Sequence, residues 1–140
     1  MNEFNLHIIE ADNDFFNGKC VSLVIPTTEG MYGIQAMHEN LVAAVTIGVV
    51  KYTLPDGTRC HAAVSNGIVK VENNEVLILV ESAEDPDDID EERALQEEQM
   101  ARDAMSGKTD RINYRAAKGM LARAVNRLKI KKRYGSTIRR

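Results

Sequence analysis

The sequence predicts an α+β fold, in which short antiparallel strands form a β-sandwich or barrel and an antiparallel two-helix hairpin follows. Residues 4–81 read as short strands with turn signals about every 8 to 12 residues and no helical period between them. The character of the chain changes at Pro86. Beyond it, apolar residues recur at spacings of three and four. We therefore expect two domains, residues 1–84 and residues 85–140.

The strands are indicated by alternation and by turn residues. FNLHIIEA is mostly apolar, and KCVSLVIP (residues 19–26) alternates throughout, so each is predicted as one strand. Asp56-Gly57 lies between two further strands, and Asn73-Asn74 lies between another two. Asp, Asn and Gly tolerate the positive φ angles of tight turns, so both dipeptides predict β-hairpins.

An acidic segment begins the first predicted helix, over residues 88–105. Asp87 or Asp88 is expected to be its N-cap, because a carboxylate can accept the unpaired N–H groups of the first turn. The acidic side chains that follow lie near the positive end of the helix dipole. The helix is expected to end at SGKTD, where Gly107 suits a C-terminal cap.

The second predicted helix covers residues 111–133, with Asp110 as its cap. A short connector makes the two helices an antiparallel hairpin. Their apolar seams are rich in alanine and bury little area, which at about 25 cal/mol per Å² contributes little free energy. We therefore expect a hairpin that is able to leave one docking site for another. The seam residues are Ile89, Ala94, Ala101 and Met105 in the first helix and Tyr114, Ala117, Leu121, Ala124 and Leu128 in the second.

Composition and charge argue against several classes of protein. The 140 residues contain no apolar run long enough to span a bilayer, and the N-terminus lacks the pattern of a secretory signal. Cys20 and Cys60 are therefore expected to be reduced thiols in strands. The first eighty residues are mildly acidic, which argues against nucleic acid as a partner. Residues 101–140 hold thirteen bases and two acids, so the tail either pairs internally or meets an acidic partner.

Three short motifs resemble known sites without matching their spacing. GKT at residues 107–109 ends like a P-loop, but Arg102 stands where the first glycine is required. The acidic DPDDIDEERALQ lacks the glycine at the sixth position of a calcium loop. His7, His38 and His61 do not have the spacing of zinc ligands. We therefore predict no metal site, and no catalytic residue is evident.

Arg123 and Arg127 stand four residues apart, so they lie on one face of the second helix. In one interpretation they pair with glutamates across the hairpin or remain solvated. In the other, they converge on a polyanion with Arg93, the one base among ten acids in residues 81–100. The guanidinium group offers phosphate a rigid fork of donors, so such a ligand would clamp the two helices together. The glutamates considered as partners are Glu91, Glu92 and Glu98.

Several segments, in order along nearly the whole chain, resemble the epsilon subunit of the bacterial F-type ATP synthase. FFNGKCVSLVIPTTEGMYGI resembles the family's opening, in which an aromatic-x-Gly turn leads into strands and an EGxxGI turn. NLVAAVTIGVVKYTLPDG is similar to its next strand, glycine and hairpin, and VSNGIVKVENNEVLILVESAE resembles its closing strands. IDEERA matches the family's I/L-D-x-x-R-A motif at every fixed position.

The chain departs from the family's pattern at two places. The family usually has a Gly-His-x-Pro-Leu turn, where QAMHENL here keeps His38 and Leu41 but not the Gly and Pro. ATP-binding members often carry a further arginine late in the first helix. Met100 falls near that point, and Arg102 is the nearest candidate.

The resemblance implies a fold and a role. The fold is a β-sandwich of about ten strands followed by the helical hairpin. The role is that of a non-catalytic central-stalk subunit, without a required cofactor, whose sandwich binds the gamma subunit and the c-ring. Gly30, Met31 and His38 are expected on that side of the sandwich. The protein would then be peripheral to the cytoplasmic face of the bacterial plasma membrane and would couple proton flow to rotation.

The resemblance also implies a regulatory hairpin. In some bacterial members the hairpin binds ATP when folded. When extended, it reaches into the alpha/beta catalytic hexamer and inhibits ATP hydrolysis. Here an apolar wall for adenine, an acceptor for its amine or for ribose, and three phosphate-binding arginines would form the site. The expected residues are Ile89, Asp90, Arg93, Ala94, Arg123 and Arg127, with Glu84 as a weaker candidate.

Two alternatives stay open at this point. The chain could be a free-standing ATP-sensing adaptor of the same shape, which would bind ATP without a stalk partner. It could also be a small enzyme with its site in a cleft of the sandwich, which would show turnover.

Overall fold

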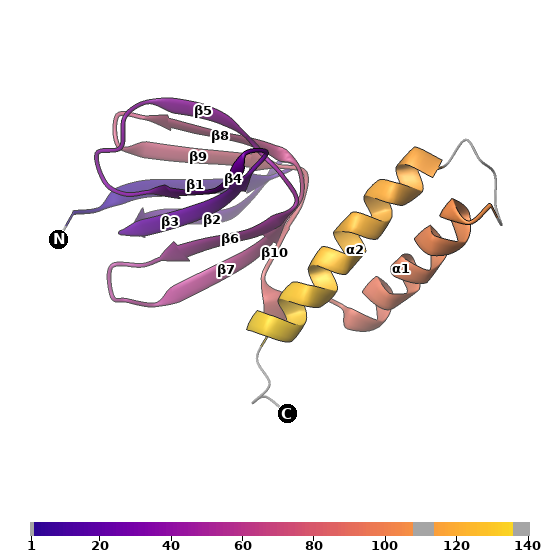
Figure 1. Cartoon of the computed structure of the whole chain (residues 1–140). Coiled ribbons are helices and arrows are strands. Elements are labelled where there is room, and N and C mark those ends of the chain that lie inside the picture. The colour runs from indigo at the N-terminus through magenta and orange to yellow at the C-terminus, as the bar shows by residue number, and fades with distance from the viewer. Residues whose placement is uncertain (1, 108–113, 136–140) are drawn as a thin grey trace. The chain divides into compact units, whose positions relative to one another are not determined.

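The computed structural model describes residues 2–107 and 114–135, and the chain divides into two compact units, Met1–Asp85 and Pro86–Arg140. The first unit is built of strands and the second of helices (Figure 1). The predicted fold class, a sandwich followed by a helical hairpin, is confirmed. The strands are β1 (Phe4–Glu10), β2 (Asn13–Cys20), β3 (Ser22–Thr27), β4 (Gly30–Ile34), β5 (Leu41–Val45), β6 (Gly48–Thr53), β7 (Arg59–Val64), β8 (Gly67–Glu72), β9 (Glu75–Val80) and β10 (Ala83–Glu84).

The strands of the first unit form one ten-stranded sheet, which folds over an apolar core (Figure 1). The strand order is β10-β7-β6-β3-β5-β8-β9-β1-β2, and β4 pairs with β3. The pairs are antiparallel except that of β1 with β9, which is parallel. Buried residues alternate with more exposed ones along β1, β8 and β9, as the period of two requires, whereas β7 ends in three consecutive buried residues. The largest fully buried side chains include Phe4, Leu6, Ile8, Leu23, Ile25, Ile34 and Ile78.

Both predicted hairpins are confirmed. Gly57 has a φ of +93° in the turn between β6 and β7, and the Asp56 carboxylate accepts a hydrogen bond from the backbone N–H of Thr58 at 2.9 Å. Asn73 and Asn74 have φ angles of 53° and 62° between β8 and β9. Two successive positive φ angles match the twist of the flanking strands, so the residue types that predicted these turns also explain them.

The prediction of one continuous strand over residues 19–26 is wrong. Strand β2 ends at Cys20 and β3 begins at Ser22, while the backbone N–H of Val21 bonds to the carbonyl of Thr53 at 2.9 Å. Alternation is therefore interrupted, and Cys20 is buried. The aromatic-x-Gly turn expected from the resemblance is also not a turn, because Phe16–Gly18 lies inside β2.

The second unit contains a 3-10 turn, η1 (Pro86–Asp88), and two helices, α1 (Glu91–Met105) and α2 (Tyr114–Tyr134). The helices run side by side in opposite directions (Figure 1). The expected N-cap at Asp87 or Asp88 is wrong, because η1 occupies those positions and Ile89 is buried after it. Asp90 is the cap, with its carboxylate accepting from the backbone N–H of Arg93 at 3.1 Å.

The C-terminal end of α1 follows the prediction closely. Ser106 is the cap residue, and Gly107 has a φ of +89°, the left-handed conformation that favours glycine after a helix. The expected start of the second helix at residues 111–113, the cap Asp110, and Lys108 and Thr109 of the GKT motif lie outside the described residues.

Alanines form most of the buried positions on the two helices. Tyr114, expected in the seam, is 50% exposed, while Met105, Leu121 and Leu128 are half-buried. Small side chains let the helix axes approach closely, but they remove little apolar area from water. No described helix is both long and apolar enough to cross a membrane. The buried helical residues are Ala94 and Ala101 in α1 and Ala117, Ala124 and Ile130 in α2.

Candidate functional site

One carboxylate joins two arginines across the helical hairpin. Glu97 on α1 places one oxygen, Oε2, 3.4 Å from Nε of Arg93 on the same helix. Its other oxygen, Oε1, accepts a hydrogen bond from Nη1 of Arg127 on α2 at 3.0 Å. The exposed fractions of the side chains are 70% for Arg93, 30% for Glu97 and 19% for Arg127. The cluster is thus open to solvent on the Arg93 side and mostly covered at Arg127.

Helical spacing explains how α1 contributes to this cluster. Asp90, Arg93 and Glu97 are separated by three and four residues, so they lie along one face of the helix. The carboxylate of Asp90 is held at the helix start by its bond to the backbone N–H of Arg93. The positive end of the helix dipole lies at the same place and favours an anion there.

The matching face of α2 carries a second cation. Lys131 follows Arg127 by one helical turn, and its Nζ donates to the backbone carbonyl of Asp87 at 3.2 Å. This bond ties the C-terminal part of α2 to η1. The base of the hairpin therefore holds positive groups from α2 next to the acidic segment that precedes α1.

The other sequence-predicted residues of the nucleotide site are placed differently. Ile89 and Ala94 are buried. Arg123 is exposed, and its guanidinium lies beside Gly119 on the same helix. It makes no ion pair with another described residue. Glu84 belongs to the first unit, where β10 pairs it with Ala63 of β7.

Glutamates pair with the arginines, but not the glutamates that the sequence interpretation considered. Glu98 pairs with Arg102 on its own helix at 2.9 Å, whereas Glu97 takes Arg127. Glu97 and Lys131 are the residues that sequence reasoning missed. Glu97 stands four residues after Arg93, and Lys131 stands four residues after Arg127, so this helical spacing is the signal that could have identified them.

This arrangement is able to bind an anion. Two guanidinium groups from different helices already share one set of carboxylate oxygens, and phosphate oxygens accept the same kind of charge-assisted hydrogen bond. The Arg127 side chain is largely covered, so its charge needs an anionic partner, since leaving such a charge unpaired is costly. The partner can come from the chain or from a ligand.

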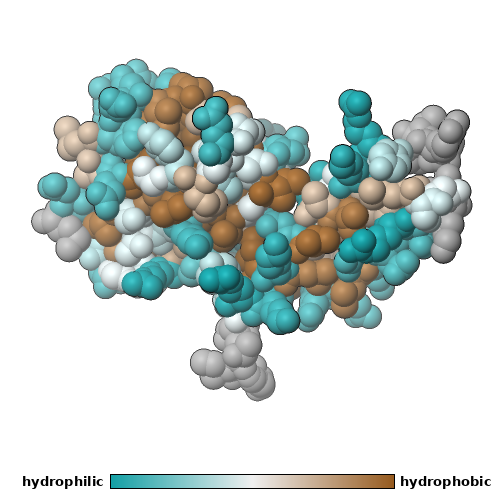
Figure 2. Space-filling view, viewed as in Figure 1, coloured by the Kyte–Doolittle hydropathy of each residue, from teal (hydrophilic) through white to brown (hydrophobic). Residues whose placement is uncertain are grey.

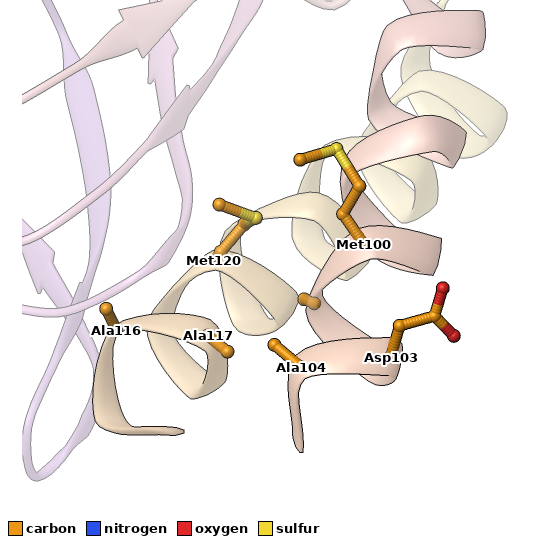
Figure 3. A pocket seen from close by; sticks show the side chains of 7 residues that line it. Met100, Asp103, Ala104, Ala116, Ala117 and Met120 are labelled. Atoms are coloured by element: carbon orange, nitrogen blue, oxygen red, sulfur yellow. The ribbon is translucent and has the colours of Figure 1, made fainter. Parts of the chain in front are cut away.

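An apolar groove of about 430 Å³ lies farther along the hairpin. Figure 3 shows Ala104 of α1 and Ala117 of α2 facing each other there, with Met100 and Met120 at the rim. Hydrophobic side chains also form a strip between hydrophilic ones on the visible face of the helices (Figure 2). The small alanine side chains leave this space unfilled, which agrees with a hairpin whose two helices pack together weakly.

The residues expected on the partner side of the sandwich gather around β4. Gly30 begins β4 with a φ of +111°, and Met31 beside it is 55% exposed. Nδ1 of His38 donates to the carbonyl of Glu39 at 2.7 Å, which leaves Nε2 to accept from the Tyr32 hydroxyl at 3.0 Å. The loop that departs from the family pattern therefore has its histidine held in place.

Burial shifts the pKa values of several titratable groups of the sandwich. Burial, with the neighbouring Cys60 thiol, raises the pKa of Cys20 to about 12, and burial also raises the pKa values of Cys60 and Tyr52. Burial and the charge of Lys51 lower the pKa of His61. Both thiols are free. Within residues 2–107 and 114–135, no group of three or more His, Cys, Asp or Glu is placed to hold a metal ion.

Two family models match the chain and together cover most of it. Residues 3–86 match the ATP synthase delta/epsilon chain β-sandwich domain, and residues 87–132 match the long α-helix domain of the same chain. The ATP synthase epsilon chain of Caldicellulosiruptor bescii is 33% identical over 130 residues, covering 93% of this chain and 94% of that protein. That of Staphylococcus aureus strain JH9 is 37% identical over 131 residues, covering 93% and 97%.

Solved structures show the same fold at lower sequence identity. A chain in the structure of the Euglena gracilis mitochondrial ATP synthase OSCP/F1/c-ring matches with a TM-score of 0.75 and 20% identity, covering 92% of this chain and 80% of that one. A chain of the Tetrahymena thermophila mitochondrial ATP synthase central stalk/c-ring matches with a TM-score of 0.59 and 13% identity, covering 91% and 95%.

Proposed function

Because the chain belongs to the delta/epsilon family of ATP synthase subunits, as an epsilon chain, we propose that it couples c-ring rotation to the catalytic head and regulates ATP hydrolysis through its hairpin. The epsilon chain is a non-catalytic subunit of the central stalk, so the chain is not an enzyme by itself. It is associated with a membrane complex. Its place in that complex is the cytoplasmic face of the bacterial plasma membrane, as a peripheral protein.

One observation carries the regulatory part of this proposal. Arg93 and Arg127, which come from different helices, meet at a single carboxylate. The IDEERA motif and the second helix therefore contribute to the same cluster while the hairpin is closed. A ligand held by both arginines would bind the closed hairpin and lose half of its contacts when the helices separate.

ATP is the ligand that this cluster suits best. Its phosphate oxygens would accept hydrogen bonds from Arg93 and Arg127, and Arg123 would reach the outer phosphate. The second carboxylate oxygen of Asp90 would accept from the adenine amine or from ribose. Ile89 and Ala94 are buried in this structure, so the base would have to uncover Ile89 in order to lie against it beside Ala94. No other cofactor is required for this role.

Binding energy of this kind is large enough to operate a switch. A ligand that binds only the closed hairpin stabilises it by about 2.7 kcal/mol at a hundredfold excess over Kd. The alanine seam contributes little apolar burial, so such a shift can decide between closed and extended hairpins. The extended form would reach the alpha/beta catalytic hexamer and inhibit hydrolysis, with the basic end of α2 meeting acidic surface there.

The sandwich would supply the fixed contact with the rotor. Its partners are the gamma subunit and the c-ring, with Gly30, Met31 and His38 on the binding side. Two observations support this placement. Met31 is an exposed large apolar side chain, and the hydrogen bonds of His38 hold its loop in one conformation beside it.

Calorimetric titration of the full chain with ATP tests the regulatory role. We expect Arg93→Ala and Arg127→Ala each to weaken binding by an order of magnitude or more, while the control Arg115→Ala, which removes an exposed arginine near the start of α2, stays near wild type. Unchanged affinity for ATP in both Arg93→Ala and Arg127→Ala would refute the proposed nucleotide site. Co-purification tests the structural role: a tagged chain that never retains a gamma subunit but still binds ATP would instead be a free-standing ATP-sensing adaptor.

A further inference from the structure

We propose that Glu97 is a built-in substitute for a phosphate group, which occupies Arg93 and Arg127 in the ligand-free hairpin and must release them before a nucleotide binds. The inference rests on the proposed nucleotide site and adds a means of setting its affinity. Glu97 would therefore be a residue that determines specificity, acting by competition with the ligand.

The geometry of the carboxylate supports competition. Its two oxygens are divided between two cations, with Oε2 facing Nε of Arg93 and Oε1 bonded to Nη1 of Arg127. A phosphate group that satisfied both arginines would likewise use two of its oxygens. It would have to stand between the same two guanidinium groups, where the Glu97 carboxylate lies now.

Charge argues in the same direction. An ionised Glu97 cancels one of the two positive charges that the arginines bring, and its negative charge repels an approaching phosphate. Its side chain is 30% exposed and lies on the helix surface, so it can turn into water when it is displaced. Arg127, which is largely covered, keeps an anionic partner throughout the exchange because phosphate replaces carboxylate.

The exchange should select ligands by their charge. A polyphosphate offers more negative charge and more oxygens than one carboxylate, so it can displace Glu97, whereas a neutral nucleoside gains nothing from the arginines. The affinity of this chain for ATP would then be set partly by its own glutamate. Replacing Glu97 with Gln keeps the length and hydrogen-bonding capacity of the side chain and removes the competing charge.

A matched pair of variants tests this proposal in the full chain. Glu97→Gln is compared with Glu98→Gln, which removes a glutamate from an ion pair with Arg102 on the same helix, away from the two arginines. Each protein is titrated with ATP, with inorganic tripolyphosphate and with adenosine. We expect Glu97→Gln to lower Kd about tenfold for ATP and for tripolyphosphate but not for adenosine, and Glu98→Gln to change no Kd more than about twofold.

The outcomes separate this inference from the function on which it rests. Tighter phosphate binding by Glu97→Gln supports the inference, and it does so even if the wild-type chain binds no ATP, a result that would overturn only the proposed nucleotide function. If the wild-type chain binds ATP or tripolyphosphate and Glu97→Gln binds it equally well or more weakly, the inference alone is overturned, because Glu97 does not then compete with the ligand. Absence of binding in every variant overturns both.

Two further measurements guard against an unfolded variant. Circular dichroism of Glu97→Gln verifies that the helix content is unchanged. Glu97→Asp keeps the charge but shortens the side chain, so it cannot reach both arginines and is also expected to bind ATP more tightly, by a smaller factor. Equal affinity of Glu97→Asp and wild type, with intact helices, would contradict the proposed competition.

Discussion

Arg127 on α2 donates a hydrogen bond to Glu97 on α1 at 3.0 Å, and this is an ion pair that links the two helices of the hairpin through side chains of opposite charge. The Arg127 side chain is 19% exposed, so the pair is screened less by solvent than an ordinary surface pair. The same bond serves the hairpin in two ways. It stabilises the closed form, and it keeps an arginine in place for a ligand.

This pair should contribute measurably to hairpin stability. In a double-mutant cycle with Arg127→Ala and Glu97→Gln, we expect a coupling energy of about 1 kcal/mol. The matched cycle on Arg102 and Glu98, an exposed pair within one helix, should give about 0.3 to 0.5 kcal/mol. Unfolding of the helices by urea, followed by circular dichroism, measures both. Equal coupling in the two cycles would show that the link across the hairpin has no special strength.

Asp90 should be the acid that matters for the start of α1. Removing its carboxylate by Asp90→Ala leaves the backbone N–H of Arg93 without its cap and should destabilise the hairpin by about 1 kcal/mol. Asp88→Ala, which changes an acid in η1 rather than the cap, should cost less than about half of that. Urea titration of the helical signal distinguishes them. A larger loss of hairpin stability in Asp88→Ala than in Asp90→Ala would show that Asp88 is the N-cap, as the sequence first indicated.

Gly67 should be intolerant of any side chain. A Cβ at this position at the start of β8 would collide with the backbone carbonyl of Leu79 in the neighbouring strand. Because backbone atoms cannot turn away, Gly67→Ala should cost at least about 2 kcal/mol of sandwich stability. Gly33→Ala in β4 is the control, since the nearest atom to its Cβ would be 4.0 Å away. Similar denaturant midpoints for the two variants would contradict this account of β8.

Stability of the sandwich should fall at alkaline pH through the buried thiol. The pKa of Cys20 is raised by burial from 9.0 to about 12, so above pH 9 the unfolded chain loses a proton that the folded chain keeps. Ionisation then favours unfolding, by up to about 1.4 kcal/mol per pH unit between pH 9 and 12. Urea midpoints at pH 8, 9.5 and 10.5 should decline less steeply in Cys20→Ala. If the urea midpoints of wild type and Cys20→Ala decline equally with pH, the effect comes from a group other than Cys20.

Local chemistry predicted much of this fold. The turns at Asp56-Gly57 and Asn73-Asn74 depend on residues that accept positive φ angles, so they could be found without knowing what the strands pack against. The hairpin could be found because its alanine stripes follow the helical period. The parallel pairing of β1 with β9 could not, because it joins strands far apart in sequence and leaves no local pattern.

The candidate site was predicted less well, for a physical reason. Three acids, Asp87, Asp88 and Asp90, are each able to cap a helix, and only the burial of Ile89 after η1 decides among them. Likewise Glu97 and Glu98 lie next to each other on α1, and which of them meets Arg127 depends on how far each helix is rotated toward its neighbour. The spacing of residues along one helix gives no information about how the two helices are rotated relative to each other.

Hydrogen exchange of the full chain, with and without saturating ATP, tests the central claim most directly, because it reports on each helix separately. The claim is that a nucleotide bridges α1 and α2 at Arg93 and Arg127 and so closes the hairpin. We predict that ATP slows exchange in both helices around these residues and that Arg127→Ala abolishes the effect, while the core strands of the sandwich do not change. The claim would be contradicted if ATP left the exchange rate unchanged in both helices, or slowed it in only one of them.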